Sequence, residues 1–181
     1  MAHLLVALRW FIGAVFLIAM LMKVRRAAWS DFIATVRAII GGAAIPATPV
    51  AVGMTVAEAA CPLLLATYPV SGFALALTLL AVMTGAIVAT IRRRAEISCP
   101  CFGASTTRLG IRHVVRNSIL AAAALAGLFG ATSYSPPLPT SGVVIAAVAG
   151  MLAAAVVAML DDIIDLFTDE TSAITANRSS A

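Results

Sequence analysis

The chain has 181 residues, of which 62% are hydrophobic and 11% are charged, with a formal net charge of +4. An ordinary soluble domain has about 45–50% apolar and about 25% charged residues, so a soluble globule and a disordered chain are both excluded. Three cysteines also exclude a disulfide-rich secreted scaffold, which leaves an integral membrane protein formed by one bundle of helices.

Five segments are long and apolar enough to cross the hydrocarbon core, which takes about 20 residues of helix. The predicted spans cover about residues 4–22, 47–67, 71–91, 114–131 and 142–160. Pro46 and Pro49 mark the start of the second span, and the run from Tyr68 to Gly72 predicts a tight turn before the third. The expected fold is therefore an all-α, polytopic transmembrane bundle of four core spans plus a fifth.

Two segments outside the spans have patterns of their own. Apolar residues recur at helical spacing between residues 23 and 40, including Trp29, Phe32 and Val36, and predict a short amphipathic helix. The spacing fits equally a helix in the membrane interface and a helix packed on the bundle. Residues 161–181 begin with several acidic side chains and predict a solvated, flexible tail.

The basic residues predict an orientation. All Lys and Arg residues except Arg9 belong to loops, span edges or the tail on one side of the five spans. The positive-inside rule places that side in the cytoplasm and the N-terminus outside. Lys23 and Arg9, near the two ends of the first span, are expected to be interface anchors. Because the basic residues flank membrane spans, no nucleic-acid partner is predicted.

Glu58 is the acidic residue of the second span, near its middle, where a carboxylate is costly and usually functional or paired. The preferred interpretation is an interhelical tie, for example to Arg116 or Asn117 at the start of the fourth span. A proton relay and a hydrogen-bond anchor for a quinone are the functional alternatives. Cys61, one turn further on, is expected to be a plain small apolar residue, with a relay thiol as its alternative.

The segment Ser98-Cys99-Pro100-Cys101-Phe102-Gly103 is the most informative motif. Thiolates are favoured beside arginines, which precede this segment. A disulfide between Cys99 and Cys101 would close a small, strained ring, and strain favours an exchanging bond over a structural one. Gly103 gives the backbone freedom that such a turn uses. The spacing therefore favours thiol–disulfide exchange, with metal binding and an inert pair as the alternatives.

Two further functions stay open at this point. A C-x-C pair lacks the usual zinc spacing, but His113 is near enough in sequence to join Cys99 and Cys101 in a copper site. The chain would then be a non-enzymatic membrane subunit or copper carrier. The other alternative is a thiol oxidase linked to a quinone, although the motifs themselves imply no cofactor.

These features together resemble the MauE family of membrane proteins, grouped with DoxX-like redox-associated proteins. The resemblance covers about residues 5–131. It is carried by Lys23 after the first span, Glu58 within the second, the basic run 92–94, the C-x-C-F-G motif ending at Gly103, and Arg116-Asn117 opening the next span.

The resemblance implies a multi-pass protein of the bacterial inner membrane that supports maturation of methylamine dehydrogenase, and hence methylamine metabolism. It implies Cys99 and Cys101 as the redox pair, a thioredoxin-like partner and an exported client protein. The chain departs from the family pattern at Pro100, where glycine is usual, at Cys61, and in its fifth span and tail. The family's clients are also outside the membrane, whereas the charge rule places Cys99 and Cys101 inside.

Overall fold

The computed structural model describes residues 2–24, 26–41, 45–92, 111–133 and 139–178, with side chains in these ranges except at 26, 27 and 160–178. Within these residues the chain forms helices and no strands. The helices are α1 (Ala2–Val24), α2 (Arg26–Ile40), α3 (Ala47–Thr67), α4 (Pro69–Arg92), α5 (Ile111–Thr132) and α6 (Thr140–Arg178). The predicted all-helical, polytopic bundle is therefore confirmed.

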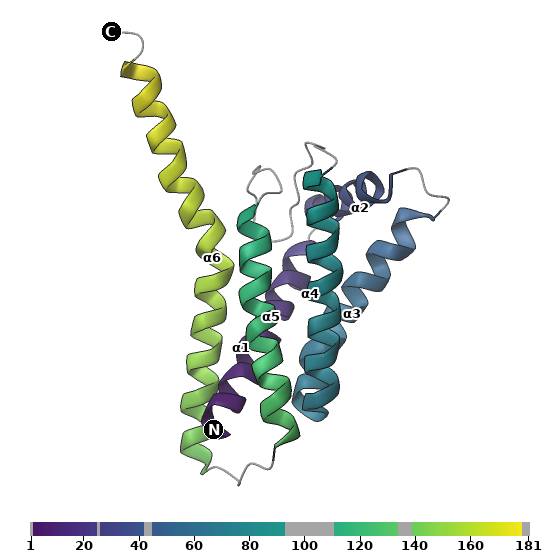
Figure 1. Cartoon of the computed structure of the whole chain (residues 1–181), viewed down its shortest axis with the longest axis vertical. Helices are drawn as coiled ribbons and strands as arrows, with labels where there is room; N and C mark the ends of the chain where they lie inside the picture. The colour runs from purple at the N-terminus through teal and green to yellow at the C-terminus, as the bar shows by residue number, and fades with distance from the viewer. Residues whose placement is uncertain (1, 25, 42–44, 93–110, 134–138, 179–181) are drawn as a thin grey trace.

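Five of these helices are long and apolar enough to cross a membrane. They are α1, α3, α4, α5 and the first part of α6, Thr140–Met159. Each predicted span lies within a few residues of one of them, because hydropathy alone determines which segments need lipid around them. Figure 1 shows these five helices running side by side, with α2 at the end of the bundle where α3 and α5 begin.

The turn between α3 and α4 is shorter than predicted. Only Tyr68 separates the two helices, and its N–H donates to the carbonyl of Leu64. Pro69 starts α4 because proline is favoured at the first helical position. Gly72 therefore lies inside α4, where a Cβ atom would come 2.5 Å from the backbone nitrogen of Leu65. The glycine allows α3 and α4 to approach closely, rather than forming the turn.

The predicted amphipathic helix is α2, and it packs on the bundle. Phe32 and Val36 are buried in a small apolar cluster with Ala47 and Ala51 of α3. The packed position is thereby confirmed, whereas a position in the membrane interface stays a prediction. The main core lies deeper, where Ile12 and other buried residues of α1 meet apolar side chains of α3, α4, α5 and α6.

The helix α6 packs on α1 through small residues spaced four apart. They are Gly142, Ala146, Gly150, Ala154 and Ala158, and all are buried. A Cβ atom on Gly150 would come 2.4 Å from the carbonyl oxygen of Ala7. Small residues on one face of a helix allow the backbones of two membrane helices to pack closely. The backbone of α6 stays helical to Arg178, through most of the segment predicted as a tail, whose flexibility stays a prediction.

Candidate functional site

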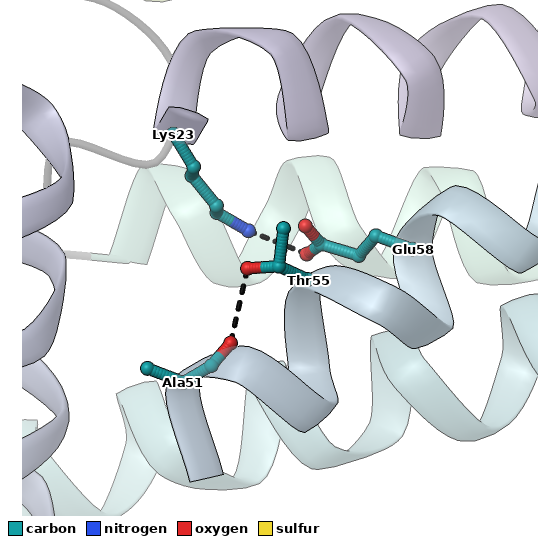
Figure 2. A network of polar contacts seen from close by, with 4 residues as sticks. All are labelled: Lys23, Ala51, Thr55 and Glu58. Atoms are coloured by element: carbon teal, nitrogen blue, oxygen red, sulfur yellow. Dashed lines mark hydrogen bonds and ion pairs between the residues drawn. The ribbon is translucent and has the colours of Figure 1, made fainter. Parts of the chain in front are cut away.

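A buried ion pair joins α1 to α3. The Nζ of Lys23, in the last turn of α1, donates to Oε1 of Glu58 in the middle of α3, as Figure 2 shows. Both side chains are fully buried. The prediction that Lys23 is an interface anchor is therefore wrong. Charged groups inside a membrane bundle are costly unless paired, and they mark sites where polarity is needed.

The partner of Glu58 also differs from the predicted one. An interhelical contact is present, but it is made with Lys23 and not with Arg116 or Asn117. The reason is that α1 packs directly on α3, and a lysine near the end of a span has a stem long enough to turn inward as well as outward. The sequence contained the signal, since Lys23 and Glu58 both belong to the family pattern, but spacing does not reveal which helices touch.

Lys23 and Glu58 differ in the further contacts that their charged groups make. The Nζ of Lys23 lies 5.0 Å from the centre of the Phe32 ring of α2, within the range of a cation–π contact. The second carboxylate oxygen of Glu58, Oε2, is buried and has no hydrogen-bond partner in the described part of the chain. The nearby Thr55 hydroxyl donates to the carbonyl of Ala51, 3.0 Å away along the same helix (Figure 2). Glu58 thus keeps one oxygen that can accept a proton or a donor.

The backbone next to Glu58 is also altered. Pro62 lies four residues further along α3. Because proline has no N–H, the carbonyl of Glu58 does not receive the usual helical hydrogen bond from it. Near its centre, α3 therefore has two acceptors without regular helical partners, the Oε2 carboxylate oxygen and the backbone carbonyl of Glu58. Glu58 lies about 16 Å along the helix axis from Ala47, the first residue of α3.

The polar residues that open α5 lie at a different place from Glu58. A cavity of about 170 Å³ lies between α2, α3, α4 and α5, and His113, Arg116 and Asn117 are among its lining residues. Arg116 and Asn117 are buried. Phe32 connects the two places, because this residue lines the cavity and its ring also faces the ammonium of Lys23.

Cys61 has the environment of a core residue. It is fully buried in the main apolar cluster, and its Sγ lies 3.8 Å from the carbonyl oxygen of Gly72. This packing agrees with the expectation of a small apolar residue. The alternative role as a relay thiol stays a prediction.

The predicted redox pair, Cys99 and Cys101, lies outside the described residues, as does Gly103. The segment that contains them follows Arg92, the last residue of α4, and precedes Ile111, the first of α5. Among the described residues no three His, Cys, Asp or Glu side chains cluster as metal ligands do. The predicted copper site of Cys99, Cys101 and His113 is not tested by this, since two of its ligands are not described.

A family model, Methylamine utilisation protein MauE, matches residues 1–130. The chain belongs to the MauE family. The predicted resemblance is confirmed, and with it a membrane protein with a role in methylamine utilisation. The match covers α1 to α4 and most of α5 and ends before α6. No curated protein and no solved structure matches the chain significantly.

Proposed function

We propose that the chain is a thiol–disulfide redox protein of the bacterial inner membrane that supports disulfide formation in exported proteins. Because the family has a role in methylamine utilisation, the proposal includes methylamine dehydrogenase as a client during its maturation. The observation that carries the proposal is the pair Cys99 and Cys101, one residue apart, in an arginine-rich segment of an otherwise unreactive chain. Neighbouring arginines favour the thiolate, which is the nucleophile in thiol–disulfide exchange.

The exchange proceeds in two steps. A thiolate of a thioredoxin-like partner attacks the Cys99–Cys101 disulfide, which gives a mixed disulfide and one free cysteine thiolate. The partner's second thiolate then attacks the mixed disulfide. The partner leaves oxidised, and both cysteines are left reduced as two electrons and two protons pass to the chain.

The buried pair has a supporting role in this proposal. Glu58 is the single acidic residue of the five spans, and its Oε2 has no hydrogen-bond partner among the described residues. A carboxylate with a free lone pair, fixed through its other oxygen by Lys23, can take up a proton released when thiols are oxidised. We assign Glu58 this proton-relay role, and Lys23 holds it in place.

Trapping a mixed disulfide tests the proposal. Chains with Cys99→Ser or Cys101→Ser retain one thiol, so one of them should accumulate a mixed disulfide with a thioredoxin-like partner that is visible on a non-reducing gel. The double variant should trap nothing, and exported client proteins should accumulate in the reduced form. Cys61→Ser is the matched control and should behave as wild type.

An unchanged redox state of the client proteins in the Cys99→Ser/Cys101→Ser double variant would contradict the proposal. Metal analysis of the purified chain separates the copper-carrier alternative. Stoichiometric copper that is lost in Cys99→Ser and in His113→Ala, with no mixed disulfide, would show a carrier instead.

A further inference from the structure

The cavity between α2, α3, α4 and α5 has the size of a site for one ring. Its volume is about 170 Å³, and a protein cavity of about 150 Å³ with an apolar lining is large enough to hold benzene. Most of its lining is apolar, with Phe32, Val36, Met54 and Ile87 contributed by three different helices. A flat, mainly apolar ring fits this space and lining.

One wall of the cavity carries a buried polar group. Asn117 lines the cavity and is only 5% exposed. Because a buried amide needs hydrogen-bond partners, a ligand that supplies them gains affinity. The amide offers both N–H donors and a carbonyl acceptor. It can therefore donate to a ring carbonyl and accept from a ring hydroxyl.

The cavity reaches the surface that faces lipid. Val50 and Val82 line it and are 38% and 58% exposed, on helices that span the membrane. A ligand with an apolar tail could extend between α3 and α4 into the acyl chains. Arg116 lies at the same polar end as Asn117, and its permanent positive charge would stabilise negative charge that develops on a ring oxygen.

We infer that this cavity binds the ring of an isoprenoid quinone, which accepts the electrons of the proposed redox pair. The electron transfer rests on the proposed function, whereas the binding does not. Asn117 donates to a carbonyl of the quinone and accepts from a hydroxyl of the quinol, so the same side chain serves both redox states.

The chemistry balances with the quinone as the oxidant. Reduced Cys99 and Cys101 lose two S–H bonds and gain one S–S bond, and the two electrons and two protons convert quinone to quinol. The two helices between which Cys99 and Cys101 lie in the sequence, α4 and α5, both line the cavity. The helix α4 contributes Ile87, five residues before Arg92, and α5 contributes His113, two residues after Ile111.

Fluorescence titration of the full chain in nanodiscs tests the binding. The probe is a benzoquinone with a single isoprene unit, added to a Trp10→Phe background that leaves Trp29 as the fluorophore. The Trp29 ring lies 6.0 Å from that of Phe32, so a quinone in the cavity should quench it saturably. Asn117→Leu should weaken binding about tenfold through the lost hydrogen bond. Ser118→Leu, at the neighbouring exposed position, should leave binding unchanged.

A second variant keeps the test decisive if Asn117→Leu folds poorly. Ala86→Leu adds side-chain volume at the cavity wall and should also weaken binding at least tenfold. Wild-type affinity in folded Asn117→Leu and Ala86→Leu would overturn the inference and assign the cavity to a lipid acyl chain.

The redox step has its own readout. The Cys99→Ser/Cys101→Ser chain should bind the quinone as wild type does but fail to convert it to quinol in the presence of a reduced thiol partner. Absent quinone binding, with mixed-disulfide trapping intact, would overturn this inference and leave the proposed function standing. Normal quinone binding with a wild-type cysteine pair that never reduces it would overturn the electron-transfer step.

Discussion

The helix α1 meets its neighbours in two different ways. Toward α3 it contributes Lys23, which forms a buried ion pair with Glu58 under the cover of α2. Toward α6 it packs on a face of small residues, such as Gly150, whose missing side chain allows the two backbones to come close. Figure 1 shows α6 at one edge of the bundle and α2 and α3 at the other.

The difference separates packing from chemistry. In lipid, small-residue packing holds helices together without any polar group, so the small residues of α6 can hold it on α1 without a charged pair. A buried ion pair adds little net stability, since the cost of desolvation offsets the attraction. The polar side chains near α2 therefore indicate a functional role and not a stabilising one. This region lies within the part of the chain that matches the family.

The largest effect is expected from breaking the ion pair. Glu58→Gln leaves the ammonium of Lys23 buried without a counter-ion, which should lower the free energy of unfolding by about 3–5 kcal/mol. The measurement is reversible unfolding in mixed micelles with increasing denaturing detergent. The double variant Lys23→Met/Glu58→Gln should recover most of the loss, because no buried charge remains. A single variant as stable as wild type would contradict the buried pairing.

A smaller loss is expected at the packing of α6 on α1. Gly150→Leu forces a side chain against the backbone at Ala7 and should cost about 1–3 kcal/mol. The same detergent titration measures it. Ala149→Leu, on the exposed face of α6, should cost nearly nothing. Mixed-disulfide trapping should be unaffected in both. Loss of trapping in Gly150→Leu at temperatures where the chain is folded would show that α6 belongs to the functional unit.

The smallest effect is expected at Arg9, a polar contact of intermediate burial. Its Nε and Nη2 donate to the carbonyls of Leu65 and Ala66 at 2.9 and 2.8 Å, at the C-terminal end of α3. Arg9→Met leaves those carbonyls unsatisfied and should cost about 1 kcal/mol, because the site is partly exposed. Arg9→Lys should recover about half of that. A loss as large as that of Glu58→Gln would remove the distinction between buried and edge polar contacts.

Hydropathy predicted the spans of this chain well, because lipid imposes the same length and composition on each of them. Periodicity similarly identified α2, whose apolar side is the one that packs on α3. The role of Gly72 was missed, because a glycine after a proline suggests a turn, whereas the close contact it permits with Leu65 depends on how α3 and α4 meet.

The site was predicted less completely than the spans. Glu58 was identified because a carboxylate inside a span is costly, but its partner depended on the packing of α1 against α3, which no local pattern specifies. Arg116 and Asn117 were identified from their place at the start of α5. Their position around a cavity could not be predicted, because the cavity forms only where α2 packs against the spanning helices.

Phe32 lies between the buried Lys23–Glu58 pair and the cavity. The ammonium of Lys23 lies 5.0 Å from the centre of the Phe32 ring, and Phe32 also lines the cavity. A ligand that shifts this ring changes a cation–π energy of about 0.5–2 kcal/mol. By thermodynamic linkage, any change in the charge state of the Lys23–Glu58 pair must then alter the ligand's affinity by the same factor. If a ligand moves this ring, occupancy of the cavity is thereby coupled to the charge of the buried pair.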